Sequence, residues 1–210
     1  MNTGRNGEFE SSTPSAIKSI KQRDLLNTWL RLYAGGQRLP KFSDYQPERM
    51  ADEAADLVYY KVESGSSPPR ITIDSDGSRI ANAYGRSGIS SIGQDLIDYI
   101  GAKLAPVVMP IYYECISRKL PVFTISRVVD SNGRPVDYER LLLPFADGAG
   151  VDRILASLKT ISEEGSFEIR NLMRTNDALP VYRLRSVIDR DLFHARPVRK
   201  SDPDDTIEFS

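Results

Sequence analysis

Residues 121–158 read PVFTISRVVDSNGRPVDYERLLLPFADGAGVDRILASL and contain three strand-like runs separated by two turn signals. The first turn holds Asn132-Gly133, a pair that accepts the positive φ angles of a tight hairpin turn. The second reversal falls at 147–150, which reads DGAG. The flanking runs are rich in Val, Ile, Phe, Tyr and Leu, residues that suit a half-buried pleated surface. We therefore predict a three-stranded antiparallel meander. The upstream segments are expected to cover one of its faces.

The segments before the meander predict two more strands and several helices. Residues 56–62 and 70–74 read as strands that form a second hairpin beside the meander. Short helices are expected over 78–84 and 94–100, and a longer one over 106–120. The expected fold class is α+β: a five-stranded antiparallel sheet with helices on one face, plus an N-terminal amphipathic helix.

The N-terminal part divides into a polar end and an amphipathic segment. Residues 1–15 offer almost nothing to bury and are expected to be disordered. Residues 16–36 form the amphipathic segment, in which apolar residues recur at helical spacing until Gly35-Gly36 stops the helix. This broad apolar face has two interpretations, docking on its own domain or a dimer contact. The candidate dimer residues are Leu25, Leu26, Trp29, Leu32 and Tyr33.

The composition of the chain argues against several classes of protein. The 210 residues carry a formal net charge of -1 with a sequence pI of about 5.9, which does not point to nucleic acid or anionic membrane. Apolar stretches are broken before the roughly 20 residues that span a bilayer, so no membrane insertion is expected. The N-terminus has no apolar segment of signal-peptide type. The single cysteine, Cys115, excludes an internal disulfide, and we expect a soluble cytoplasmic protein.

Few enzyme mechanisms fit the residues present. His194 is the only histidine and lies in a polar C-terminal stretch, so a catalytic triad or a His/Cys metal cluster cannot be assembled around it. The same position is far from where a haem ligand is needed, and Cys115 lies within the long helix rather than in a flavin-reactive loop. We expect no enzyme, no cofactor, no metal site and no catalytic residue.

Three stretches resemble a bacterial PAS-like family of small stand-alone proteins, formerly a domain of unknown function. They are DLLNTWLRLYAGGQRLPKFSDYQPERM (24–50), RITIDSDGSRIANAYGRSGISSIGQDL (70–96) and RKLPVFTISRVVDSNGRPVDYERLLLPFADGAGVDRILAS (118–157). The resemblance covers about 24–160 and implies a sensory or interaction domain without a catalytic output domain. It carries over no site residue.

A PAS-type domain encloses a small molecule between its sheet and its long helix, in a mostly apolar pocket with a few polar groups. The candidate lining residues here are Met109, Tyr112, Tyr113, Ile116, Phe123, Ile125, Arg127, Tyr138 and Arg140. One of the two arginines would point inward to meet an acidic ligand group. The alternative is ordinary core packing, with both arginines in solvent beside Asp137 or Glu139.

We expect the rest of the chain to consist of a PAS-like domain over 37–160 and a partly disordered C-terminal extension over 161–210. Residues 167–200 carry eight Lys or Arg against four Asp or Glu, an excess of four that the acidic end at 202–208 offsets. The basic segment is compatible with contact to the acidic end of the same chain and with binding of an acidic protein partner. The first hypothesis is a non-catalytic PAS-domain signalling protein that acts through protein contacts or dimerisation. The alternative is a small-molecule sensor that binds its ligand between the sheet and the long helix.

Overall fold

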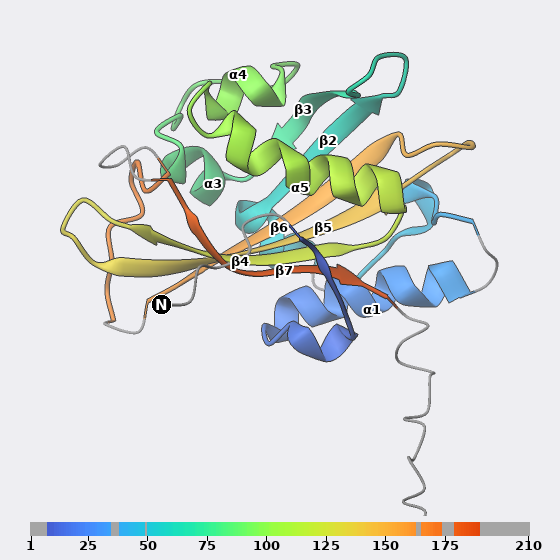
Figure 1. The fold of residues 1–210 in the computed structure, drawn as a ribbon, viewed down its shortest axis with the longest axis horizontal. Coiled ribbons are helices and arrows are strands. Elements are labelled where there is room, and N and C mark those ends of the chain that lie inside the picture. The colour runs from blue at the N-terminus through green and yellow to red at the C-terminus, as the bar shows by residue number, and fades with distance from the viewer. Residues whose placement is uncertain (1–7, 35–37, 49, 163–164, 174–178, 190–210) are drawn as a thin grey trace, which may run out of the picture.

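The computed structural model describes residues 8–34, 38–48, 50–162, 165–173 and 179–189, which form one seven-stranded sheet with helices on both faces (Figure 1). The strands are β1 (Glu10–Ser12), β2 (Leu57–Glu63), β3 (Arg70–Asp76), β4 (Val122–Val129), β5 (Pro135–Phe145), β6 (Arg153–Ile161) and β7 (Val181–Ile188). The α-helices are α1 (Ile20–Ala34), α2 (Met50–Glu53), α3 (Ser78–Ala83), α4 (Leu96–Ile100) and α5 (Ala105–Arg118). Three 3-10 turns complete the elements: η1 (Pro14–Ala16), η2 (Phe42–Asp44) and η3 (Ala54–Asp56).

The predicted meander is confirmed as β4, β5 and β6, which pair antiparallel in sequence order. At its first turn Gly133 has a φ of 80°, as the Asn-Gly pair predicts. Asp130 also holds this turn, because its Oδ1 accepts hydrogen bonds from the backbone N–H groups of Asn132 and Arg134 at 2.9 and 2.8 Å. Local turn chemistry thus fixes the register of the central strands.

The sheet is larger than the five strands predicted. Strands β2 and β3 form the expected hairpin and join the meander through β6, giving the order β1-β7-β4-β5-β6-β2-β3. The two additional strands extend the β4 edge, where β7 is antiparallel to β4 and β1 is parallel to β7. The predicted all-antiparallel five-stranded sheet is therefore wrong in strand number and in this one pairing.

Neither additional strand has a strong sequence signal. Strand β7 reads VYRLRSVI, in which Arg183 and Arg185 interrupt the apolar pattern. Strand β1 reads ESS and is held by backbone pairing to residues 186–188, which needs no apolar side chain. Residues 10–12 were expected to be disordered and 181–188 to belong to a separate extension, but both are part of the same sheet. Residues 1–7 and 190–210, which include His194, lie outside the described residues.

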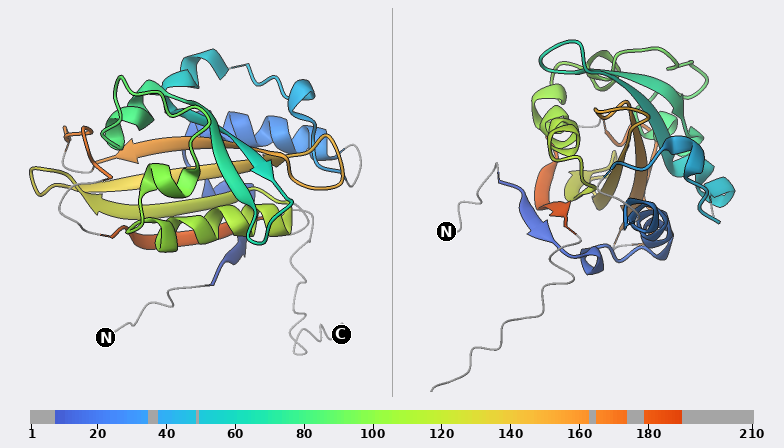
Figure 2. Two further views of the ribbon diagram at one scale, coloured as in Figure 1. Left: turned by 90° about the horizontal axis from the view of Figure 1, so that it is seen from above. Right: turned by 90° about the vertical axis from the view of Figure 1, so that its right-hand side faces the viewer.

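Helices cover both faces of the sheet, which corrects the expectation of a single covered face. Figure 2 shows the sheet between α5 on one side and α1 on the other. We call these sides the α5 face and the α1 face. Adjacent residues of β5 alternate between them, since Leu142 packs in the α5-face cluster and Leu141 and Leu143 in the α1-face cluster. Each face therefore has its own apolar core.

Helix α1 confirms the predicted amphipathic helix and lies against its own sheet. Leu25, Leu26 and Trp29 have no exposed surface, and Trp29 donates from Nε1 to the carbonyl oxygen of Pro144 in β5 at 2.7 Å. These three candidate dimer residues are buried within the chain. The other two, Leu32 and Tyr33, are half-buried. Docking on its own domain is therefore the role that the packing gives this helix.

Candidate functional site

The nine predicted pocket residues are divided between the two faces of the sheet. Met109, Tyr112, Tyr138 and Arg140 meet between the sheet and α5. Tyr113 and Ile116 of α5 are half-buried against the same core. This part of the predicted set is brought together on the α5 face.

The remaining three predicted residues are on the α1 face. Phe123 and Ile125 pack in the α1-face core. Arg127 follows in the same alternation and binds the Asp137 carboxylate through Nε and Nη2, at 2.8 and 2.9 Å. The prediction took odd-numbered residues of β4 together with even-numbered residues of β5, although paired positions put these on opposite sides of the sheet. For this reason it was wrong for these three.

Arg140 is the unusual residue of the α5 face. Its side chain extends from the middle of β5 into the core, and the residue is only 3% exposed. The guanidinium carbon lies 5.3 Å from the ring centre of Tyr138 and 5.7 Å from that of Tyr112. No carboxylate among the described residues pairs with it, and its Nε has no hydrogen-bond partner. Tyrosine rings and hydroxyls surround this buried guanidinium, but no acid among the described residues neutralises its charge.

A second arginine lies at the same level of the sheet. Thr124 of β4 is the cross-strand partner of Arg140 on one side and of Arg185 on the other. Directly opposed residues share a face, so the three side chains form a row across β5, β4 and β7. We call Arg140, Thr124 and Arg185 the arginine row. Arg185 is half-buried, and its guanidinium carbon lies 4.0 Å from the ring centre of Tyr182.

The arginine row leaves polar atoms unsatisfied. The Nε atoms of Arg140 and Arg185 and the hydroxyl of Thr124 are buried without a hydrogen-bond partner. The guanidinium of Arg140 also interacts with the hydroxyls of Tyr138 and Tyr182, and these hydrogen bonds lower the pKa of both phenols against the larger effect of burial. Arg185, like Arg140, forms no ion pair with a carboxylate among the residues that the structure describes. Buried polar groups in folded proteins are nearly always hydrogen-bonded. The three atoms of the row are therefore candidate contacts for a polar ligand.

The tyrosines around the row are neutral hydrogen-bond donors. Burial raises the pKa of Tyr112 to about 12 and raises the pKa of Tyr60 and Tyr138 well above the ordinary value. Tyr112 donates to the hydroxyl of Tyr60 at 3.1 Å. Burial opposes the charge of Arg140, but the surrounding tyrosine oxygens, that of Tyr112 first, raise its pKa above the ordinary value. The site is therefore cationic, with phenol groups around it.

This chemistry suits binding of an anion rather than covalent catalysis. Guanidinium groups and hydroxyl donors match carboxylate and phosphate oxygens, and the tyrosine rings offer apolar contact area. Cys115 lies on α5 with no exposed surface, and burial raises the pKa of its thiol, which makes it a poor nucleophile. Within the described ranges, no three His, Cys, Asp or Glu side chains gather closely enough to hold a metal ion.

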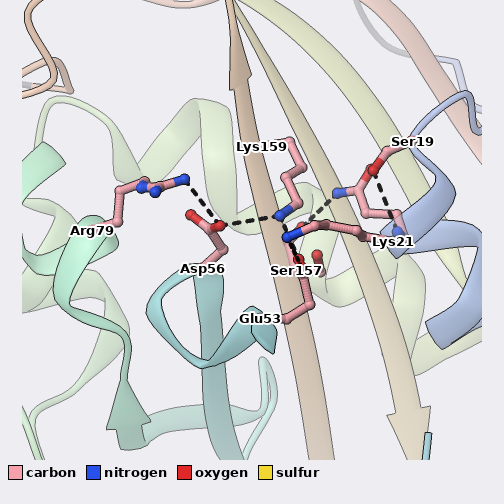
Figure 3. Close-up of polar contacts among 8 residues, drawn as sticks. Ser19, Lys21, Glu53, Asp56, Arg79, Ser157 and Lys159 are labelled. Carbon is pink, nitrogen blue, oxygen red and sulfur yellow. Dashed lines mark hydrogen bonds and ion pairs between the residues drawn. The ribbon is translucent and has the colours of Figure 1, made fainter. Parts of the chain in front are cut away.

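A second buried charge cluster, on the α1 face, differs from the arginine row because its charges are paired. Lys159 of β6 contacts the carboxylates of Glu53 and Asp56, as Figure 3 shows. Lys21 lies 2.5 Å from Glu53, and Arg79 lies 3.2 Å from Asp56. Burial raises the pKa of Glu53, but the hydrogen bonds from Lys159 and Lys21 outweigh it, so the net shift is downward. This network joins α1, α2, η3, α3 and β6 and has a structural role.

An open cleft of about 1100 Å³ lies elsewhere, where α1 ends and β5 turns into β6. Leu32, Tyr33 and Lys119 are among its lining residues. None of its described lining side chains has a buried polar atom without a partner. We therefore assign the candidate site to the arginine row and not to this cleft.

The sequence pattern identified Arg140 and missed Thr124 and Arg185. Arg185 was grouped with the basic residues of the C-terminal part, because β7 was not recognised as a strand of the sheet. The alternation of Leu184 and Ser186 with Arg185 and Val187 is the signal that would have found it.

No family model matches this chain, and neither a curated protein nor a solved structure shows significant similarity to it. No helix among the described residues combines the length and the apolarity needed to cross a membrane. The functional argument consequently depends on the geometry of the site.

Proposed function

We propose that this protein is a non-catalytic regulatory protein with a PAS-like sheet, and that it senses a small anionic molecule bound between the sheet and α5. The observation that carries the proposal is Arg140, which is 3% exposed and has no carboxylate partner among the described residues. The PAS-like assignment is supported by the five contiguous strands β3-β2-β6-β5-β4 and by the position of α3, α4 and α5 between β3 and β4 in the chain.

The energetic argument compares a buried charge with and without its partner. Removing a guanidinium from water costs several kcal/mol unless ion pairing and hydrogen bonds compensate. Cation–π contacts with Tyr112 and Tyr138, which are desolvated here, return about 2 kcal/mol each, but they do not neutralise the charge. An apolar side chain of similar volume at position 140 would avoid the penalty. The carboxylate or phosphate of a bound ligand would supply the missing compensation, and this gives the arginine a functional reason to be there.

The burial of the site also connects binding with a conformational response. Because Arg140 is covered by Tyr112 of α5, a ligand reaches it only when a covering element moves. Arg185 of the arginine row lies 5.8 Å from the ring centre of Phe9, next to β1. Ligand binding can therefore alter the packing of α5 or of β1, and through them the contacts with a partner protein or a second copy. Such a shift requires different affinities for the two conformations.

A second candidate function is an adaptor that binds a protein partner and no ligand. It is favoured by three exposed isoleucines, Ile89, Ile92 and Ile97, which are 55%, 67% and 40% exposed and occupy the loop before α4 and α4 itself. Exposed apolar side chains that gather on one surface are a common feature of protein contacts. Native mass spectrometry of the purified protein separates the two candidates. A retained small anion supports the sensor, and an apo mass together with capture of one defined partner through these isoleucines supports the adaptor.

The proposal is tested with benzoate, an aromatic monoanion, and benzyl alcohol, its neutral counterpart. We expect benzoate to raise the thermal unfolding temperature of the wild type and of the control variant Arg127→Met, because Arg127 is on the α1 face. Arg140→Met should abolish this stabilisation, and benzyl alcohol should stabilise none of the three proteins. If benzoate stabilises wild type and Arg140→Met equally, or stabilises neither, the proposal is wrong.

A further inference from the structure

The arginine row contains more positive charge than a single carboxylate neutralises. Arg140 and Arg185 are the two cross-strand partners of Thr124, so their Cα atoms are separated by two strand spacings, roughly 9–10 Å. Both guanidinium groups act on Tyr182: burial raises the pKa of this phenol, and the charges of Arg140 and then Arg185 lower it. The two charges therefore converge on one region of the α5 face.

Among the described residues, no acidic side chain forms an ion pair with Arg140 or Arg185. The acidic side chains nearest in the strand register, Asp137 and Glu139, alternate onto the α1 face, and Asp137 binds Arg127 and Arg183 there. Glu114 of α5 is engaged by Arg118. Arg140 is buried and Arg185 is half-buried, and neither has an acidic partner among the described residues. Their positive charges therefore also repel each other.

The atoms of the arginine row that lack a hydrogen-bond partner lie on neighbouring strands. Arg140 Nε, Thr124 Oγ1 and Arg185 Nε come from three adjacent strands, and none of these atoms has a hydrogen-bond partner. A ligand group with one oxygen satisfies one of them. A phosphate monoester, or two carboxylates on adjacent carbons, presents several oxygens and two charges across the same span.

We infer that the ligand is a dianion, held by Arg140 and Arg185 on either side of the Thr124 hydroxyl, with an aromatic or apolar body against the tyrosine rings. This inference rests on the proposed function and names the ligand class of the same site. Arg140 anchors any anion there, and Arg185 selects for the second charge. Arg185 is thus a specificity-determining residue.

The test compares four probes of similar shape: benzyl alcohol, benzoate, phthalate and phenyl phosphate. Binding is measured by calorimetry on the full chain. We expect at least one dianion to bind wild type about 10-fold or more tightly than benzoate, which is the contribution of one additional charge-assisted hydrogen bond. Arg185→Met should weaken binding of the dianion more than binding of benzoate, so that the advantage of the dianion falls to within about 2-fold. The dianion that binds identifies a phosphate monoester or a dicarboxylate as the natural class.

Arg183→Met is the matched control, because Arg183 is on the same strand but pairs with Asp137 on the other face. It should keep the full preference for the dianion. Arg185→Lys keeps the positive charge and loses the planar guanidinium, so it should keep part of the preference for the dianion. This result would show that the effect of Arg185→Met comes from loss of charge and not from misfolding.

The possible failures are distinguishable. Equal affinity of wild type for benzoate and both dianions overturns the dianion inference and leaves the anion sensor intact. A dianion preference that survives Arg185→Met overturns the role of Arg185. Absence of binding by every anion overturns both the inference and the proposed function.

Discussion

The buried Arg140 and the half-buried Lys159 lie on adjacent strands, one register step apart, and point to opposite faces of the sheet. Arg140 pairs across the strands with Leu158, the residue before Lys159. Lys159 meets two carboxylates, those of Glu53 and Asp56, whereas Arg140 meets tyrosine rings and no carboxylate among the described residues. The same sheet thus holds one compensated and one uncompensated buried charge, and substitutions at the two positions should have opposite effects on stability.

Replacement of Lys159 by Met should destabilise the protein by about 3 kcal/mol, because it leaves two buried carboxylates with fewer partners. Urea unfolding at neutral pH measures this loss. Lys61→Met is the matched control: Lys61 binds Asp74 at 2.6 Å, but its side chain is 56% exposed, so the loss should stay below about 1 kcal/mol. Equal losses in the two variants would show that the buried network has no special role.

Replacement of Arg140 by Met should leave the free energy of unfolding unchanged or raise it by about 1–4 kcal/mol in buffer without organic anions or phosphate. The physical reason is that the apolar side chain fills the space and removes an unpaired charge. The same urea experiment measures it. A loss of more than about 2 kcal/mol would mean that the tyrosine contacts alone stabilise the guanidinium, and that no ligand is needed to explain it.

The pH dependence of stability should contain two opposite contributions. Hydrogen bonds lower the pKa of Asp137, with that from Arg127 the largest, and the pKa of Glu53 is also lowered. Their stabilisation is fully present above the ordinary carboxyl pKa, near 4–4.5, and is lost as the pH falls through the lower folded-state values. Unfolding followed from pH 7 to pH 3 should therefore show a loss of stability below about pH 4.5 that is smaller in Glu53→Gln.

Glu139 should behave in the opposite way. Burial, and then the charge of Asp137, raise its pKa, and its Oε2 has no hydrogen-bond partner. The ionised form therefore opposes folding above the ordinary pKa, and the penalty disappears as the pH falls below it. Glu139→Gln should stabilise the protein by about 1 kcal/mol at pH 7 and have little effect near pH 4. A stability loss at pH 7 would contradict this.

Substitutions in the buried face of α1 should lower the stability of the folded protein. Leu26→Ala removes a fully buried side chain and should cost about 2–5 kcal/mol, whereas Leu32→Ala, at a half-buried position, should cost less. Thermal unfolding measures both, and light scattering reports the molar mass of each variant. A dimer that dissociates in Leu26→Ala with unchanged thermal stability would restore the dimer-contact interpretation for this residue.

Local chemistry made the centre of the fold predictable. The Asn132-Gly133 turn and the alternating runs on either side of it identified the meander, since turn type and side-chain period are properties of neighbouring residues. Helix α1 was also predictable, because its apolar residues recur with the period of a helix. The choice between docking and dimerisation was not, since both bury the same apolar stripe. Only the contact of Trp29 with β5 decided it.

The sequence by itself placed Arg140 in a strand of the meander and left open whether one of two arginines points inward or both lie in solvent. Only the tertiary structure decided which arginine points inward, because a shift of one residue in a strand moves a side chain to the other face. It also placed Arg185 beside Thr124, through the pairing of β7 with β4. Such pairing joins backbone groups about sixty residues apart in the sequence, and no local pattern of side chains encodes it.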